Sequence, residues 1–247
     1  MKARHVYLDA GNTRLKWRLY DAHGIRHDGA AYYAELDALW PLCKTGMHAY
    51  LASVASAELT RSLTEGLLQR GVETTVMTVQ QQAGGVTNGY SDPGQLGVDR
   101  WLALVGARQR TLSACLVVSA GTALTVDAMA ASGDFLGGVI VPGMALMQQA
   151  LQTGTARVQV ENGAWQRFPT NTPNAVHTGV ITALAGTVLT QYTALAQISA
   201  THPLCMVTGG DADLLLPYLT TIPVEQCTIV PHLILEGIEY LVGECRE

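Results

Sequence analysis

Charged side chains are scarce in this chain of 247 residues. Only 14% of its residues are Asp, Glu, Lys or Arg, whereas 48% are hydrophobic, so much of the chain must be buried. The basic residues are scattered without a run of Lys or Arg, and the formal net charge is −5. Because nucleic-acid-binding proteins usually present a basic face, this composition argues against a nucleic-acid partner.

Cysteine and histidine also lack the spacings that mark a metal site. The five cysteines are odd in number and widely separated, and no CxxC pair occurs, so neither a zinc site nor a disulfide framework is indicated. The seven histidines show no ligand spacing. The first residues lead directly into an apolar segment and leave no room for a signal peptide, so we expect a cytoplasmic protein.

One long stretch, Phe168–Gly210, contains no Asp, Glu, Lys or Arg. Its most apolar part, Val180–Ala200, is interrupted by Thr, Gly and Gln and lacks the basic flanks and aromatic belt of a membrane span. We therefore predict no membrane association but a buried helix, covered by another lobe or by a second subunit. So much uncharged surface is difficult to cover within one small lobe, which predicts a homodimer.

Two glycine turns give the halves of the sequence a common pattern. Asp9–Thr13 follows the apolar run Val6–Leu8, and Ser119–Ala123 follows Leu116–Val118. An alternating segment comes after each turn, so each half predicts a strand, a tight turn and a second strand. Glycine lets backbone N–H groups approach a phosphate, while Thr or Asn adds side-chain donors. The repeat predicts two similar lobes that hold a nucleoside triphosphate between them.

The predicted lobes are residues 1–114 and 115–247, each with a mixed α/β order. Further strands are predicted at Gly29–Tyr33, Tyr50–Val54, Val72–Val79, Phe135–Val141 and Leu204–Thr208, and helices at Ala57–Arg70, Gly97–Arg110, Met144–Thr153, Asn174–Ile198 and Ile234–Val242. The polar, glycine-rich segment Gln80–Gly94 is long enough to be a functional loop.

Asp9 ends the first strand and opens the first turn. A carboxylate there can hold Mg²⁺, directly or through water, against triphosphate oxygens. The alternative is an ordinary hairpin in which Asp9 and Asn12 bond to their own backbone. The second copy of the turn favours the phosphate site.

Asp99 stands at the start of a predicted helix, immediately after the glycine loop. The positive field of the helix N-terminus favours its ionised form. An ionised carboxylate can accept a proton from a substrate hydroxyl, as phosphoryl transfer to an alcohol requires. Arg100 can pair with a carboxylate or phosphate. The alternative is a helix-capping Asp99 beside a solvated Arg100.

Several strings occur together in one order along nearly the whole chain. They are Asp9–Thr13, Asn88–Pro93, Leu96–Trp101, Gly121–Ala123 with Thr125 and Asp127, Gly137–Gly143, Asn171–Thr172 with Ala175 and Gly179, and Thr208–Gly210. In these strings the sequence resembles the type III pantothenate kinases, within the acetate and sugar kinase, chaperone and actin superfamily.

The resemblance implies an α/β fold of two RNase-H-like (actin-like ATPase) lobes, with mixed sheets flanked by helices, and a homodimer. It implies ATP-dependent phosphorylation of pantothenate on its primary hydroxyl, the first step of coenzyme A biosynthesis. By matching position, ATP would face Asp9, Ala10, Gly11, Asn12, Thr13, Arg14, Leu15, Lys16 and Thr122, with Asp9 serving Mg²⁺. Pantothenate would lie among Tyr90, Gly97, Val98, Asp99, Arg100 and Thr172, with Asp99 as the general base.

Ser119 departs from the family pattern. The family usually has Asp at this position, where it helps bind an activating monovalent cation, K⁺ or NH₄⁺; a hydroxyl can ligate the cation but brings no charge. Two other functions remain open from the residues alone. One is another small-molecule kinase of the superfamily, such as a sugar kinase, although the cysteine-rich zinc motif of similar sugar kinases is missing. The other is a non-catalytic accessory factor for transcription.

Overall fold

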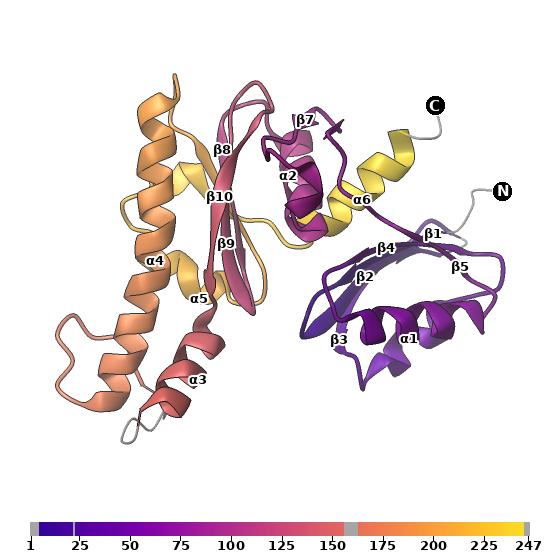
Figure 1. The fold of residues 1–247 in the computed structure, drawn as a ribbon, viewed down its shortest axis with the longest axis horizontal. Helices are drawn as coiled ribbons and strands as arrows, with labels where there is room; N and C mark the ends of the chain where they lie inside the picture. Colours follow the sequence, from indigo (N-terminus) through magenta and orange to yellow (C-terminus); the bar gives the residue numbers. More distant parts are fainter. Residues whose placement is uncertain (1–4, 22, 156–162, 245–247) are drawn as a thin grey trace. The chain divides into compact units, whose positions relative to one another are not determined.

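The computed structural model describes residues 5–21, 23–155 and 163–244 and divides into two compact units (Figure 1). Unit 1 contains the described residues up to Arg110 and those from His232 onward, and unit 2 is Thr111–Pro231. Each unit is built on its own five-stranded mixed sheet.

The sheet of unit 1 has the strand order β3-β2-β1-β4-β5. Its strands are β1 (His5–Ala10), β2 (Arg14–Tyr20), β3 (Arg26–Tyr32), β4 (His48–Ser53) and β5 (Glu73–Val76). β1, β2 and β3 pair antiparallel, while β4 and β5 continue the sheet in parallel from β1. One face of this sheet carries the apolar side chains of Val6, Leu8 and Leu15, which are completely buried.

The sheet of unit 2 repeats this arrangement, with the order β10-β9-β8-β11-β12. Its strands are β8 (Cys115–Ala120), β9 (Ala123–Met129), β10 (Phe135–Pro142), β11 (Leu204–Thr208) and β12 (Cys227–Ile229). Again the first three strands in the chain pair antiparallel and the last two add in parallel. The repeated topology confirms the predicted pair of RNase-H-like lobes with mixed sheets.

Helix α1 (Ala57–Leu68) connects β4 to β5 and places Leu63 and Leu67 in the apolar core of unit 1. It begins at Ser56, whose Oγ accepts a hydrogen bond from the Leu59 N–H. The same core includes two short 3₁₀ helices that the sequence analysis did not predict, η1 (Leu36–Ala38) and η2 (Trp40–Leu42). The predicted loop Gln80–Gly94 contains a small hairpin, β6 (Gln82–Ala83) and β7 (Val86–Thr87), and ends in η3 (Pro93–Gln95).

Helices α2 (Val98–Arg110) and α6 (Leu233–Glu244) pack closely against each other in unit 1. Their backbones touch at two glycines: a Cβ added to Gly237 would lie 2.0 Å from the Leu102 carbonyl oxygen, and one on Gly106 would lie 2.3 Å from that of Leu233. Such contact requires glycine. A lobe of residues 115–247 would have included α6, whereas the structure places this helix in unit 1.

Polar contacts also join α6 to the sheet of unit 1. Arg18 is 3% exposed, and its guanidinium donates two hydrogen bonds to Asp28, at 2.9 and 3.1 Å, and one to Glu239 of α6, at 3.1 Å. The Tyr20 hydroxyl donates to the other oxygen of Glu239 at 2.6 Å. Because breaking a buried ion pair is costly, these contacts fix α6 on the sheet.

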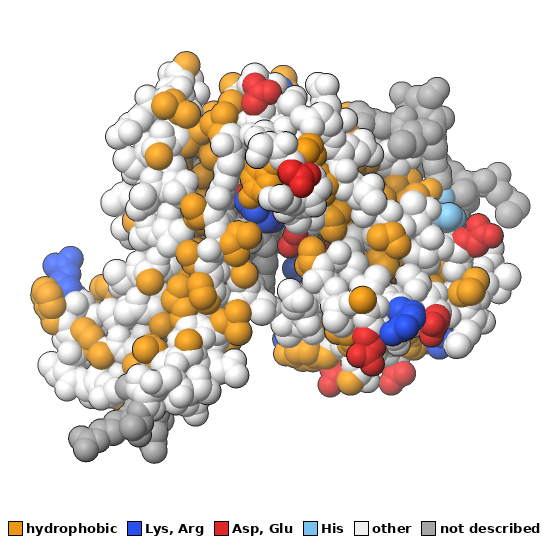
Figure 2. Space-filling view, in the orientation of Figure 1, with side chains coloured by type: hydrophobic (Ala, Val, Ile, Leu, Met, Phe, Trp, Pro, Cys, Tyr) orange, Lys and Arg blue, Asp and Glu red, His pale blue; other side chains and the backbone are white. Residues whose placement is uncertain are grey.

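Unit 2 contains α3 (Met144–Gly154), α4 (Thr172–Ile198), α5 (Ala212–Leu215), η4 (Leu216–Tyr218) and η5 (Val224–Gln226). Helix α4 is long and apolar enough to cross a membrane by length and composition, yet 39% of its most apolar window is buried in the protein. Val180, Leu184 and Val188 lie in the core of unit 2, so one side of α4 packs against the sheet of this unit. The surface that α4 forms in Figure 2 is orange and white, because the helix has no Lys, Arg, Asp or Glu.

Candidate active site

The first glycine turn lies between β1 and β2 and brings Asp9 opposite Lys16. These two residues are directly paired across the antiparallel strands, so their side chains share one face of the sheet. The Lys16 Nζ lies 3.9 Å from Asp9 Oδ2. The turn itself is closed by a hydrogen bond of 3.1 Å from the Gly11 N–H to the Arg14 carbonyl oxygen. The sequence thus forms a tight turn with one acidic and one basic side chain beside it.

Asp9 is a buried carboxylate, only 6% exposed. Burial raises its pKa from 3.8 to about 6, Lys16 opposes this rise, and the nearby charge of Asp99 adds to it. The positive charge beside Asp9 is therefore too small to stabilise its ionised form fully. A divalent cation would supply the missing charge, and Mg²⁺ is commonly bound by one or two carboxylates together with substrate phosphates. The carboxylate chemistry of Asp9 fits such an ion.

The described residues contain no group of three or more His, Cys, Asp or Glu that could hold a metal ion by itself. Any Mg²⁺ at Asp9 would therefore complete its coordination with water and phosphate oxygens. This matches the behaviour of Mg²⁺, which gives up its water reluctantly and seldom occupies a cage made only of protein ligands.

Tyr33 was missed by the sequence analysis, although it supports the first turn. Its hydroxyl donates a 2.6 Å hydrogen bond to the Gly11 carbonyl oxygen. Burial and the charge of Asp9 raise the pKa of Tyr33 to about 12, so the hydroxyl remains a donor at neutral pH. Tyr33 follows β3 in the chain, and no local motif distinguishes it from its neighbour Tyr32. Only the packing of β3 beside β2 reveals its position.

The other predicted nucleotide-binding residues of the first turn fall into two groups. Ala10 and Leu15 are 1% and 0% exposed, with both side chains in the apolar core, so they can face a ligand only through their backbone. Asn12, Thr13 and Arg14 are exposed. Arg14 donates a 2.7 Å hydrogen bond to the Tyr32 hydroxyl, and its guanidinium carbon lies 4.5 Å from the centre of that ring.

Asp99 lies in the first turn of α2, as predicted. Its Oδ1 accepts a 2.8 Å hydrogen bond from the backbone N–H of Arg100, which orients the carboxylate. A Cβ on Gly97 would lie 2.6 Å from the same oxygen, so the glycine makes room for it. Asp99 and Asp9 are far apart in the sequence, yet the charge of Asp99 contributes to the raised pKa of Asp9. Both predicted functional carboxylates therefore lie in unit 1 and interact electrostatically.

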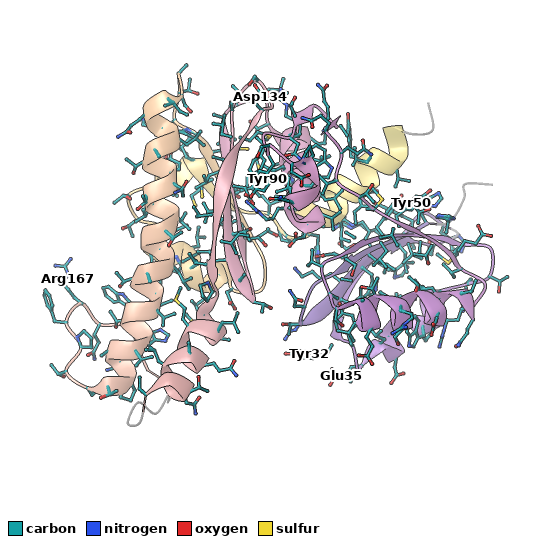
Figure 3. All side chains as sticks on the ribbon, in the orientation of Figure 1. Tyr32, Glu35, Tyr50, Tyr90, Asp134 and Arg167 are labelled. Carbon is teal, nitrogen blue, oxygen red and sulfur yellow. The ribbon has the colours of Figure 1, made fainter. Side chains whose placement is uncertain are left out.

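Arg100 is buried, 5% exposed, and not solvated as the alternative interpretation proposed. Its Nη1 donates a 2.9 Å hydrogen bond to the Tyr90 hydroxyl, and Tyr90 lies beside α2 in Figure 3. Asn88 holds this loop in place: its Oδ1 accepts from the Tyr90 N–H at 3.0 Å, and its Nδ2 donates to the Pro93 carbonyl oxygen at 3.3 Å. The structure thus brings Tyr90 and Arg100 together and gives Asn88 a supporting role that was not predicted.

The remaining predicted site residues, Thr122 and Thr172, belong to unit 2 and are exposed. Thr122 lies in the second turn, and its carbonyl oxygen accepts a 2.9 Å hydrogen bond from the Gly143 N–H before α3. Thr172 is the first residue of α4 and follows Asn171, whose Oδ1 accepts from the Asn174 N–H at 3.0 Å. Both threonines therefore stand at fixed turns with their side chains on the surface.

Ser119 is one of three residues with a hydroxyl group that lie side by side in the sheet of unit 2. It pairs with Thr125 on β9 and with Thr208 on β11, so the three side chains lie on one face of three neighbouring strands. The opposite face carries Leu116, Val118 and the rest of the apolar core. Three hydroxyl oxygens are hard ligands of the kind that alkali cations accept, but they bring no negative charge.

The protein has the actin-like ATPase fold, as the mixed sheet repeated in both units indicates. A buried carboxylate stands beside the first glycine turn of this fold. At the level of fold, the chain is similar to a Campylobacter jejuni protein assigned to the Baf family of transcriptional activators, with 19% identity, a TM-score of 0.61 and coverage of 97% and 98% of the two chains. It is also similar to Ta0583, an archaeal actin homologue, with 10% identity, a TM-score of 0.51 and coverage of 98% and 99%.

Sequence comparison defines the family. Residues 5–194 match the family model described as type III pantothenate kinase. A type III pantothenate kinase of Thiobacillus denitrificans is 44% identical over 239 residues, which cover 97% of this chain and 96% of that protein. The chain belongs to the type III pantothenate kinase family.

Proposed function

We propose that this chain transfers the terminal phosphoryl group of ATP to the primary hydroxyl of pantothenate, with Asp99 as the general base and Asp9 as the ligand of Mg²⁺. Membership of the family supports the reaction, which is the first step of coenzyme A biosynthesis. The observation that supports the residue roles is that Asp9 and Asp99 lie in the same unit and interact electrostatically, Asp9 beside the first glycine turn and Asp99 in the first turn of α2.

Asp9 and the first turn would serve the nucleotide. The backbone N–H of Asn12, with the side chain of Lys16, would offer a donor and positive charge to phosphate oxygens. Mg²⁺, when bound, would neutralise charge on those oxygens. The negative charge of ionised Asp9 is only partly compensated within the protein, so a bound cation would stabilise this carboxylate. The turn therefore provides the positioning and charge neutralisation on which phosphoryl transfer depends.

Asp99 would accept the proton of the attacking hydroxyl. The hydrogen bond from the Arg100 N–H fixes the direction of this carboxylate. As the hydroxyl oxygen bonds to phosphorus, its proton would pass to the carboxylate of Asp99. General bases of this kind contribute about a hundred- to ten-thousand-fold to the rate.

Arg100 and Tyr90 would recognise the acceptor. Pantothenate carries a carboxylate, and an arginine whose guanidinium is held by a neighbour is well suited to pair with one. The Tyr90 hydroxyl, already bonded to Arg100, can adjust its proton toward a second acceptor. Gly97, Val98 and Thr172 are further proposed contacts of pantothenate, and Thr122 is a proposed contact of the nucleotide.

We propose a monovalent cation near Ser119, supported by the row of hydroxyl groups that it forms with Thr125 and Thr208. We also propose a cytoplasmic homodimer without nucleic-acid or membrane partners. The uncharged surface of α4 supports the dimer, because a second subunit would cover it.

The test of the proposed reaction is the release of ADP by purified protein with Mg²⁺ and ATP, compared among pantothenate, a panel of sugars and no acceptor. We expect turnover that depends on pantothenate and a product heavier by one phosphate group in mass spectrometry. Turnover with a sugar at an equal or higher kcat/KM would instead identify another kinase of the superfamily. Binding of ATP without turnover on any acceptor would contradict a catalytic role.

A further inference from the structure

Cys205 and Cys227 are distant in the sequence but lie directly opposite each other on the parallel strands β11 and β12 of unit 2. Neighbouring strands are about 4.8 Å apart, and a disulfide needs Cα atoms about 4.4–6.8 Å apart. Residues paired in this way direct their side chains to the same face of the sheet, so the two thiols lie side by side. The pair is therefore placed to form a disulfide without rearranging the strands.

The two cysteines differ in their access to solvent. Cys205 is 0% exposed and belongs to the core of unit 2, whereas Cys227 lies on the edge strand and is partly exposed. Tyr192 of α4 lies near both sulfurs and donates a 3.1 Å hydrogen bond to the Pro203 carbonyl oxygen. A small oxidant can thus reach Cys227, while Cys205 stays behind it.

The two neighbouring thiols are chemically unequal. The interaction between them raises the pKa of the buried Cys205 and lowers the pKa of Cys227. The thiolate is the reactive form of cysteine. The more accessible sulfur is therefore also the one more readily ionised.

We propose that Cys205 and Cys227 form a redox-active dithiol that peroxides convert into an intramolecular disulfide. The Cys227 thiolate attacks one oxygen of the peroxide, which breaks the O–O bond, gives a sulfenic acid and releases an alkoxide or hydroxide; this anion takes up the proton that Cys227 lost when it ionised. The Cys205 sulfur then attacks the sulfenic sulfur. The S–O bond breaks, the Cys205 proton leaves with the hydroxyl group as water, and the S–S bond forms. The two cysteines lose two electrons, and the peroxide gains them.

The consequence of the disulfide is a covalent link between β12 and the rest of the sheet. β12 has three residues and is the edge strand of its sheet, paired along β11, with a 2.8 Å hydrogen bond from the Val230 N–H to the Val207 carbonyl oxygen just beyond it. Disulfides in a reducing compartment are usually transient. The disulfide would therefore form when the protein meets an oxidant, and a thiol reductant would convert it back to the dithiol.

The test is to treat the full-length protein with hydrogen peroxide and map its thiols by mass spectrometry. Trypsin leaves both cysteines on one peptide, because no Lys or Arg occurs between Arg167 and Arg246; a glutamate-specific protease separates them by cutting after Glu225. We expect a linked pair of peptides, a loss of two hydrogens from the intact protein and recovery of both thiols with dithiothreitol.

The matched variants are Cys227→Ser, which should eliminate the linked peptides, and Cys115→Ser, which should leave their yield unchanged. Cys115 is the proper control because it is also buried, on the adjacent strand β8, yet it pairs with Leu204 and so points to the other face. Wild-type protein in which Cys227 proceeds to the sulfinic acid while Cys205 stays free would overturn the proposal. So would a loss of two hydrogens that persists in folded Cys227→Ser.

Discussion

The substitution Asp9→Asn should stabilise the protein without its ligands while removing its proposed metal ligand. Burial raises the pKa of Asp9 from 3.8 to about 6. Between these two values the folded protein holds the proton and the unfolded chain does not, so stability falls as the pH rises through this window. Above pH 6 the free energy of unfolding is reduced by the full cost of burying the ionised Asp9. The difference of about two pH units, at about 1.4 kcal/mol each, amounts to about 3 kcal/mol. Asparagine has nearly the same shape and carries no charge, so it should avoid this cost.

The assay is urea unfolding of Asp9→Asn and its parent in buffer with EDTA and without nucleotide, followed by tryptophan fluorescence. Trp17, Trp40 and Trp101 lie in unit 1 and Trp165 in unit 2, so a Trp165→Phe background restricts the signal to unit 1. We expect the variant to be more stable by about 2–3 kcal/mol near pH 8, and this advantage to disappear near pH 4.

The control is Asp37→Asn, which removes an exposed carboxylate from the same unit and should change stability by less than about 0.5 kcal/mol. Equal stability of Asp9→Asn and its parent near pH 8 would refute the reasoning, and so would a loss of stability there. Either result would mean that other groups of the protein compensate the negative charge of Asp9. The burial of Asp9 would then give no reason to expect a bound cation.

Other contacts give further predictions. Gly237→Ala should lower the unfolding free energy of unit 1 by about 1–3 kcal/mol, measured in urea, because its Cβ would lie 2.0 Å from the Leu102 oxygen; a stabilised variant would contradict the backbone contact. Ser119→Asp should lower the K⁺ or NH₄⁺ concentration for half-maximal activity at constant ionic strength, because a carboxylate adds charge to the ligands; an unchanged cation dependence would argue against this site. Light scattering should give twice the chain mass of 26.3 kDa, whereas the single-chain mass at micromolar concentration would exclude the proposed dimer.

Local patterns were sufficient to predict most elements of the fold. The alternating segments around Gly11 and Gly121 became the strand pairs β1–β2 and β8–β9. The strand Leu204–Thr208 has the predicted bounds, and α4 begins two residues before the predicted start. These elements were recognisable because turn chemistry and apolar periodicity are properties of neighbouring residues.

Contacts between distant segments could not be predicted in the same way. Helix α6 follows the second repeat, but the glycine contact with α2 and the bonds of Glu239 to Arg18 place it in unit 1. Tyr33 reaches Gly11 only because β3 lies beside β2. The raised pKa of Asp9 likewise depends on burial and on Asp99, which no local pattern contains. The residue types of the site were therefore predictable, whereas their electrostatic coupling required the fold.

The most direct test of the central claim is pantothenate-dependent turnover by Asp99→Asn. An amide cannot accept the hydroxyl proton, so kcat should fall by about a hundred- to ten-thousand-fold. Binding of ATP and pantothenate, measured by calorimetry, and the unfolding free energy should remain close to those of the parent. A variant that is equally stable, binds both substrates and retains the parental kcat would contradict the assignment of Asp99 as the general base.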